Sequence, residues 1–272
     1  MIITVHTLFP GLIDAYRSEA ILARAEREGR LEVRARDLRR FAGNRTGRVD
    51  DAPYGGGAGM VIRVDVAARA LDESRADVPP PDRTILLAPS GRPLTQERVQ
   101  ELAALDHLVL LSGRYEGFDA RTEALVDEEL SIGDYVLMGG ELPALVVIEA
   151  IARLLPGVLG SQESYRDESF ATGLLDWPEY TRPPSFRGLE VPEVLRSGHH
   201  GRVASWRRGR ALARTARRRP DLLDRGALDA HDRALLAEAE AEIEAESVEA
   251  SSEAAEAARG EAGAVTDAAE DA

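Results

Sequence analysis

The stretch "ELSIGDYVLMGGELPA" (residues 129–144) decides how the chain is interpreted. A β-strand has no need of Gly133 beside Asp134, and each glycine of the pair at 139 and 140 would cost a helix about 1 kcal/mol relative to alanine. The residues between the two glycine breaks are too few for a helix and too apolar for a free surface loop. We therefore expect a bent loop packed against a flat ligand, with the backbone amides of Ile132–Leu137 contacting its polar edge. A β-bulge or hairpin is the alternative.

The sequence before residue 160 alternates strand-like and helix-like segments. Strands are expected at Ile2–Leu8, Leu31–Ala35, Thr84–Ala88, His107–Leu111 and Leu130–Ile132. Helices are expected over residues 10–28, 65–72, 95–102, 119–126 and 142–155. Continuous apolar strands that alternate with helices predict a mostly parallel sheet covered on both faces. Such sheets bind ligands in the loops after the carboxyl ends of their strands, and three glycine-containing loops fall at those places.

The composition excludes several classes of protein. The chain has 272 residues and no cysteine, which removes disulfides, thiolate metal sites and cysteine nucleophiles and predicts a cytoplasmic protein. All 34 basic residues are arginine, so a Walker A loop and lysine Schiff-base chemistry are excluded. The N-terminal "MIITVHTLFPG" lacks the features of a signal peptide, and the apolar runs are too short to span a bilayer, so no membrane partner is expected.

The net charge of −14 is unevenly distributed. Residues 237–272 hold ten Glu, two Asp and one Arg with almost no large apolar residue, and we expect an acidic disordered tail there. Residues 194–220 hold nine Arg and no acid. A face with that many guanidinium groups attracts phosphates, which favours a nucleic-acid partner over an ordinary solvated helix face.

Three further motifs each have two interpretations. "YGGGAGM" (residues 54–60) fails the G-x-G-x-x-G spacing and is either a flexible turn or a loop that lets a ligand approach the backbone. "SGRYEGFD" (residues 112–119) is an ordinary strand-to-helix loop or an anion site at a helix N-terminus. "RDESF" (residues 166–170) places two carboxylates side by side, which are either solvated or a general base on a mobile segment.

Taken together, the motifs resemble a known family. "VDDAPYGGGAGM", "LLSGRYEGFD", "SIGDYVLMGGELPA", "RLLPGVLG" and "GLLDWPEYTRPPSFRGLEVPEVLRSGHHGRVASWRR" are similar, in order, to bacterial tRNA (guanine-N1)-methyltransferases. The resemblance covers residues 1–236 and implies the SPOUT fold: an α/β domain with a mostly parallel sheet and a deep trefoil knot, followed by a small all-α domain. It also implies a homodimer.

The implied domains follow the changes in composition. Residues 1–160 would be the knotted catalytic domain, 161–172 a flexible linker, 173–236 a helical tRNA-binding domain and 237–272 the acidic tail. By resemblance the catalytic domain holds S-adenosylmethionine in a bent shape. Its contacts would be Leu87, Pro89, Gly91, Gly113, Tyr115, Glu116, Ile132, Gly133, Asp134, Tyr135, Val136 and Leu137. The family is also described as using Mg²⁺, for which the sequence assigns no ligand set.

The implied reaction is methylation of N1 of the guanosine immediately 3′ of the tRNA anticodon. Guanine N1 carries a proton, so a base must remove it while a cation stabilises the negative charge on O6. Arg153 matches the family's cation. The family's base is an Asp directly before Ser-Phe; here that position is Glu168, with Asp167 one residue earlier, and both remain candidates. Contacts to tRNA are expected from Asp50, Gly59, Ser169, Arg196, His199, Arg202, Arg207 and Arg208.

Two other functions remain open from the sequence. One is a SPOUT methyltransferase with a different RNA target, against which the arginine- and tryptophan-containing C-terminal segment argues. The other is an RNA-binding relative without catalytic activity. The presence of Arg153, Glu116 and an acid at 167 or 168 argues against that second function.

Overall fold

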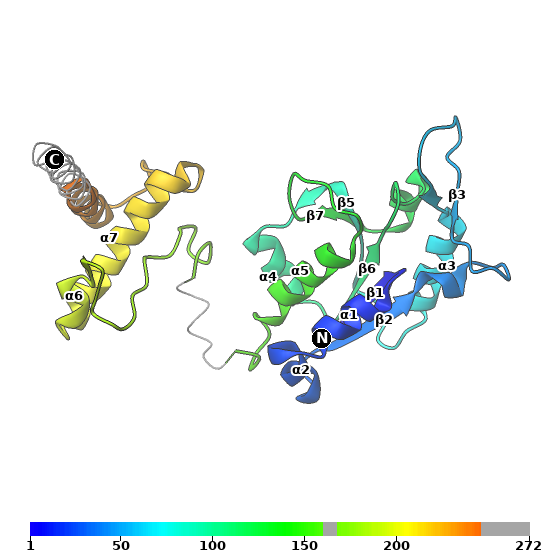
Figure 1. Cartoon of the computed structure of the whole chain (residues 1–272), viewed down its shortest axis with the longest axis horizontal. Helices are drawn as coiled ribbons and strands as arrows, with labels where there is room; N and C mark the ends of the chain where they lie inside the picture. Colours follow the sequence, from blue (N-terminus) through cyan, green and yellow to red (C-terminus); the bar gives the residue numbers. More distant parts are fainter. Residues whose placement is uncertain (160–167, 246–272) are drawn as a thin grey trace, which may run out of the picture. The chain divides into compact units, whose positions relative to one another are not determined.

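The computed structural model describes residues 1–159 and 168–245, and the chain divides into two compact units, Met1–Glu163 and Ser164–Ala272 (Figure 1). The first unit contains a five-stranded sheet and its helices, and the second is mainly helical. Most of the expected linker, including Asp167, lies outside the described residues.

All five expected strands are present, and every pair of neighbours in the sheet is parallel. The order is β2-β1-β6-β5-β7. The strands are β1 (Ile2–Thr7), β2 (Glu32–Asp37), β5 (Arg83–Pro93), β6 (His107–Ser112) and β7 (Glu128–Ser131). The prediction of a parallel sheet is therefore confirmed.

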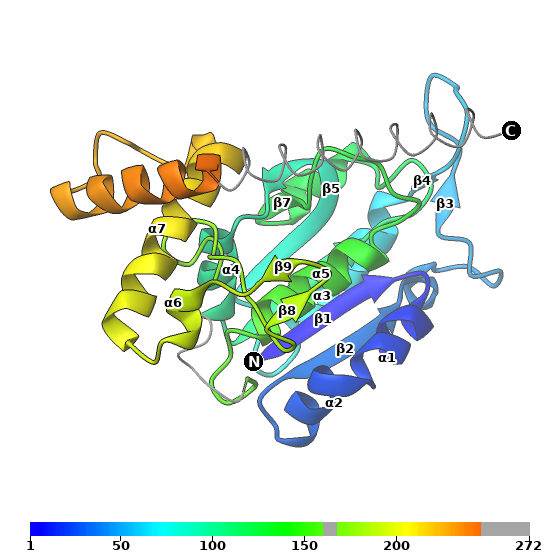
Figure 2. The same cartoon turned by 60° about the vertical axis from the view of Figure 1, so that its left-hand side comes forward.

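Helices cover both faces of this sheet. Successive side chains of a strand point to opposite sides, so the apolar strands present an apolar surface on each face. On one face, Ile3 and Val5 of β1 belong to an apolar core with α1 (Pro10–Arg17), α2 (Ala20–Arg27), α4 (Gln96–Ala103) and α5 (Glu141–Ala152) (Figure 2). On the other face, Val109 and Leu111 of β6 pack with α3 (Val64–Arg75).

Two of the expected helices differ in the structure. The single helix expected over residues 10–28 is two helices, because the backbone turns at Ala20, whose φ is +48°. The turn lets Ile13 of α1 and Leu22 of α2 both reach the core. The helix expected over 119–126 is the short 3₁₀ helix η2 (Ala120–Leu125), whose first turn is capped by the Asp119 side chain.

Residues 40–60, between the strand expected at Leu31–Ala35 and the helix expected over 65–72, are partly ordered into secondary structure. The 3₁₀ helix η1 (Leu38–Phe41) precedes it. The strands β3 (Asp50–Asp51) and β4 (Val61–Ile62) form an antiparallel pair at the base of the glycine-rich loop. That loop is therefore the tip of a hairpin.

The strand expected to end at Ala88 continues instead to Pro93, with an irregularity inside β5. Leu87 and Arg92 both pair with Leu130 of β7, so the residues between them bulge out of the ladder. At Gly91 a Cβ atom would meet the backbone of Glu129 and Leu130. Glycine at this position therefore serves the close approach of two strands.

The second unit consists of short elements around one long helix. Its elements are β8 (Ser185–Phe186), β9 (Leu189–Glu190), α6 (Glu193–Arg196), α7 (His200–Arg218), η3 (Pro220–Leu222) and a helix over residues 230–245. Leu174, Leu212, Ala213, Leu236 and Ala239 form its apolar core. The expected helical character is present, together with a two-stranded β8–β9 hairpin that the sequence did not predict.

The prediction of disorder is wrong for the part of the tail at residues 237–245. The helix that begins at residue 230 continues to residue 245, and Ala239 is buried in the core with Ile243 packed against it. The segment of alternating Ala and Glu is therefore helical, and the helix buries the face that carries its small apolar side chains. The rest of the tail, residues 246–272, lies outside the described residues.

Candidate active site

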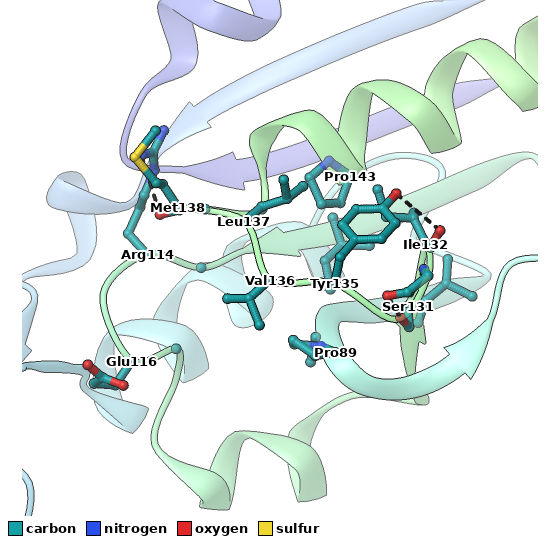
Figure 3. Close-up of a pocket in the computed structure, with 18 of the residues that line it drawn as sticks. Pro89, Arg114, Glu116, Ser131, Ile132, Tyr135, Val136, Leu137, Met138 and Pro143 are labelled. Carbon is teal, nitrogen blue, oxygen red and sulfur yellow. Dashed lines mark hydrogen bonds between the residues drawn. The ribbon is translucent and has the colours of Figure 1, made fainter.

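A pocket lies at the carboxyl ends of β6 and β7 and at the bulge in β5, where the sequence placed its ligand loops (Figure 3). Ten of the twelve residues expected to contact the cofactor line it. They are Leu87, Pro89, Gly113, Tyr115, Glu116, Ile132, Gly133, Tyr135, Val136 and Leu137. Gly91 and Asp134 are not among the lining residues.

The segment 132–138 forms an open apolar wall of this pocket. Val136 and Met138 are 85% and 88% exposed, and Tyr135 is 55% exposed. Soluble proteins rarely leave such a group of large apolar side chains uncovered unless a ligand or partner packs there. Within the described part of the chain, the backbone amides of Val136 and Leu137 have no hydrogen-bond partner. The wall therefore offers both apolar surface and free donors.

The segment is bent by local hydrogen bonds at its start. Gly133 has a φ of +145°, which a residue with a side chain rarely adopts. Its amide donates to Ser131 Oγ at 3.2 Å, and its carbonyl accepts from the amide of Tyr135 at 3.0 Å. These bonds turn the chain away from β7 and present Tyr135 at the pocket.

Glycine is needed at positions 139 and 140 for a different reason than at position 133. Neither has a positive φ, but a Cβ on Gly140 would lie 2.8 Å from Ser112 Oγ and 2.9 Å from Ser112 Cα. The Gly140 amide donates to Gly113 O at 2.8 Å. A Cβ on Gly139 would meet the Arg114 and Glu141 side chains, so the two glycines let the start of α5 pack directly on the end of β6 and the loop that follows it.

A buried ion pair fixes the same junction. Glu141, which is 1% exposed, accepts hydrogen bonds from Arg114 Nε at 2.8 Å and from Thr7 Oγ1 at 2.7 Å. The Arg114 guanidinium also lies over the Phe9 ring, 4.5 Å from its centroid, and lines the pocket. One carboxylate thus joins the ends of β1 and β6 to the first turn of α5.

The glycine-rich hairpin loop lies beside the pocket at Glu116. The Glu116 amide donates to Met60 O at 3.0 Å, and a Cβ on Gly59 would lie 2.6 Å from Glu116 Cγ. Gly59, expected to contact substrate, is therefore next to a pocket residue. Asp50 lies in β3, where it pairs with Ile62, and does not line the pocket.

Sequence reasoning missed several lining residues: Ala88, Arg114, Gly117, Leu130, Ser131, Met138, Gly139, Gly140 and Pro143. Most of them directly continue the predicted segments. Arg114 stands inside the "SGRYEG" motif, and Met138–Gly140 continue the apolar run between the two glycine breaks. Extending the prediction to the whole loop at each strand end would have found them.

The expected catalytic residues belong to different units. Arg153 is exposed at the C-terminal end of α5. Glu168 belongs to the second unit, where it lines a cavity with His200, Arg207 and Arg208. Asp167 lies outside the described residues, so the choice between the two acids stays a prediction. The amide of Asp176 donates to the hydroxyl of Ser169 at 3.0 Å.

In the structure, several arginines of the arginine-rich segment (residues 194–220) pair with acids from elsewhere in the chain, so its surface is less uniformly basic than the sequence predicts. Arg208 forms a bidentate pair with Asp232 at 3.0 and 2.6 Å, and Arg214 lies 3.1 Å from Asp176. Arg210 is buried and lies 3.2 Å from Glu242. Acids from distant parts of the sequence thus neutralise several of these cations.

The other expected tRNA contacts remain more accessible. Arg196, His199 and Arg202 are exposed near the start of α7, and Arg207 is half-buried against Trp177.

Among residues 1–159 and 168–245, no group of three or more His, Asp or Glu side chains could hold a metal ion, so nothing there supports the implied Mg²⁺. In the same ranges, no helix is both long and apolar enough to cross a membrane.

Comparison with known proteins identifies the family. Residues 1–225 match the model of the family described as tRNA (Guanine-1)-methyltransferase TrmD. A tRNA (guanine-N(1)-)-methyltransferase of Deinococcus radiodurans is 57% identical over 230 residues, covering 85% of this chain and 82% of the relative. A Thermus thermophilus enzyme of that name is 56% identical, covering 88% of this chain and 98% of the relative. A Neisseria meningitidis relative is 47% identical over 229 residues, covering 84% and 92%. This chain belongs to the tRNA (guanine-N1)-methyltransferase family of enzymes.

Proposed function

We propose that this chain methylates N1 of the guanosine immediately 3′ of the tRNA anticodon, position 37, with S-adenosylmethionine as methyl donor. The observation that carries the proposal is the pocket at the ends of β6 and β7 and the bulge of β5, in a chain whose relatives are named tRNA (guanine-N(1)-)-methyltransferases. The trefoil knot expected from the sequence is part of the same proposal.

The pocket residues fit the chemistry of S-adenosylmethionine. Pro89, Val136 and Leu137 supply apolar surface for a flat base, and the unpartnered amides of Val136 and Leu137 supply donors for its polar edge. Glu116 supplies an acceptor at the side of the glycine-rich loop. When bound, the cofactor supplies an electrophilic methyl group. The chain's part is to hold it, exclude water and prepare guanine N1.

The proton on guanine N1 sets the requirement for a base. A carboxylate of Glu168 or Asp167 accepts this proton, and the Arg153 guanidinium stabilises the negative charge that develops on O6. A positioned base contributes typically 10²–10⁴-fold to a rate. These roles rest on the family resemblance of the three positions.

An apolar face of the first unit supports the proposed homodimer. Phe9, Leu12 and Tyr16 at α1 and Leu142 and Val146 of α5 are 43–60% exposed. The α1 and α5 helices pack against each other, so these side chains lie on neighbouring elements. Large exposed apolar groups of this kind are typical of subunit interfaces. A second copy of the chain would cover them. A cytoplasmic location belongs to the same proposal.

Methyl incorporation into defined tRNA transcripts tests the function. The full chain, supplied with labelled S-adenosylmethionine, should methylate a transcript with guanosine at the target position, and nucleoside mass spectrometry should identify 1-methylguanosine. A matched transcript with adenosine at that position should remain unlabelled. Label in both transcripts would indicate another RNA target, and cofactor and tRNA binding without any label would indicate a non-catalytic RNA-binding protein.

A further inference from the structure

A groove in the second unit combines aromatic, apolar and cationic side chains. Its walls are the segment 177–184, the region of α6 and one side of α7. We call it the Trp177 groove; its defining residues are Trp177, Tyr180, Arg182, Arg196, Val203 and Arg207. Proline and aliphatic side chains make up most of the remaining lining.

The charge of this groove is positive. Arg182, Arg196 and Arg207 line it, and none of them takes part in an ion pair in the described part of the chain. The one acid in the lining, Glu179, accepts a hydrogen bond from Trp177 Nε1 at 2.6 Å. Unlike the paired Arg208 of α7, these three cations are available to an anionic ligand.

The floor of the groove contains a stacked pair. The Arg207 guanidinium lies over the Trp177 ring, 4.8 Å from its centroid, and its buried Nε has no hydrogen-bond partner. The Tyr180 ring lies 6.3 Å from the Trp206 ring. Aromatic rings and arginine planes are the surfaces on which proteins stack unpaired nucleobases, and nearby guanidinium groups bind the attached phosphates.

We propose that the Trp177 groove binds one unstacked nucleotide of the tRNA, with its base on the Trp177–Arg207 pair and its phosphate at Arg182 or Arg196. The inference rests on the proposed function, because it takes the bound RNA to be the tRNA substrate. A proline-rich peptide could also fill a groove lined by aromatic rings, but three unpaired cations favour a polyanion.

Binding of tRNA to full-length variants tests the groove. Trp177→Leu keeps an apolar side chain but removes the aromatic stacking surface, and Arg196→Gln removes one exposed cation. Phe186→Leu and Arg233→Gln are the matched controls, because both residues lie in the same unit outside the groove. We expect about tenfold weaker tRNA binding for Trp177→Leu and wild-type binding for both controls.

Salt dependence separates stacking from phosphate contact. Arg196→Gln should lower the slope of log affinity against log salt by about 1, whereas Trp177→Leu should leave the slope unchanged. Both variants should raise KM for tRNA while leaving kcat at saturating tRNA unchanged. Circular dichroism melting establishes that each variant is folded, and Trp177→Phe provides a milder substitution if Trp177→Leu is not.

Tryptophan fluorescence tests occupancy directly, since the chain has two tryptophans. In Trp206→Phe, Trp177 is the remaining tryptophan. Binding of tRNA should quench its fluorescence. A tRNA with one abasic site in an unpaired loop should quench this fluorescence less. Wild-type affinity of Trp177→Leu, or a quench by polyproline that tRNA does not displace, would overturn the inference. If the wild-type chain binds tRNA but transfers no methyl group, the proposed function fails while the groove can still pass this test.

Discussion

Arg114 Nε donates to the buried Glu141 Oε2 at 2.8 Å, across the junction between the loop after β6 and the first turn of α5. Glu141 also accepts from Thr7, so a single carboxylate sets the direction of the Arg114 side chain. Breaking a buried pair by removing one charge costs more than the pair contributes, because the other charge remains in a poorly solvated place.

Substituting Glu141→Gln should therefore impair both folding stability and cofactor binding. The amide can still accept from Thr7, but its other end presents a donor to Arg114, so we expect a loss of about 1–3 kcal/mol in unfolding free energy. Calorimetric titration should also show weaker S-adenosylmethionine binding. Thr7→Val is the control, because it leaves the ion pair intact while it removes the other hydrogen bond to Glu141, together with the one that Thr7 Oγ1 accepts from the Phe9 amide. Equal cofactor affinities of the two variants would contradict a positioning role for Glu141.

The second prediction concerns Gly140. An alanine Cβ there would lie 2.8 Å from Ser112 Oγ and 2.9 Å from Ser112 Cα, and the backbone cannot move aside cheaply. Gly140→Ala should lower the melting temperature and weaken cofactor binding, since α5 must shift away from the pocket. Gly11→Ala has nothing within 4 Å of its added Cβ and should be neutral or slightly stabilising. Equal melting curves for the two variants would show that the junction is not tight.

The contrast between these glycines marks what the sequence could predict. The apolar strands and the loops at their carboxyl ends followed from periodicity and from the chemistry of parallel sheets. Glycines at 139 and 140 were expected to bend the chain around a ligand, but they serve close packing, Gly139 against the Arg114 and Glu141 side chains and Gly140 against Ser112. Most of these contacts join residues far apart in the sequence. No local pattern contains such information.

The arginine-rich segment illustrates the same limit. Between residues 194 and 220 it lacks any acid, and the prediction was a uniformly basic face. In the structure Asp232, Glu242 and Asp176 approach from other parts of the chain and neutralise three of its arginines. The helix over 237–245 was missed because alanine was counted as too small to bury, although Ala239 packs into the core.

The third prediction is a pH dependence that originates at His6. Burial, followed by the charge of Arg36, lowers the pKa of His6 to about 3. The unfolded state therefore binds a proton near pH 6.5, while the folded state binds it only near pH 3. The contribution of neutral His6 to stability is full above pH 6.5 and is lost as the pH falls toward 3, by about 1.4 kcal/mol per pH unit at most.

Denaturant unfolding at about pH 7.5 and about pH 5.5, on either side of the ordinary histidine pKa, measures this effect. The wild-type chain should lose stability between the two values, and His6→Gln should lose less, because glutamine does not titrate. His231→Gln, a substitution of an exposed histidine, should retain the wild-type dependence. The same loss in all three proteins would assign the pH dependence to other groups.

The fourth prediction concerns the apolar face of α1 and α5. Val146→Glu places a charge on the exposed apolar face of α5 beside α1, which a subunit interface would have to bury unpaired. Sedimentation should show a dimer for the wild-type chain and a monomer for Val146→Glu. Val78→Glu, at an 89% exposed position outside this face, should remain dimeric. A monomeric wild type would remove the proposed assembly.

The last prediction separates the two candidate bases. The resemblance aligns Glu168 with the Asp that is the family's base, and we propose that the additional methylene of Glu168 extends its reach. Glu168→Ala should lower kcat for tRNA methylation by about 10²–10⁴-fold with little change in cofactor binding, because proton removal matters only in the reaction. Asp167→Ala should retain most of the activity, and Glu168→Asp should recover part of what Glu168→Ala loses. The reverse ranking would assign the base to Asp167. Near-normal turnover in both alanine variants would mean that another group removes the N1 proton, because a chain that methylates guanine N1 must still accept it.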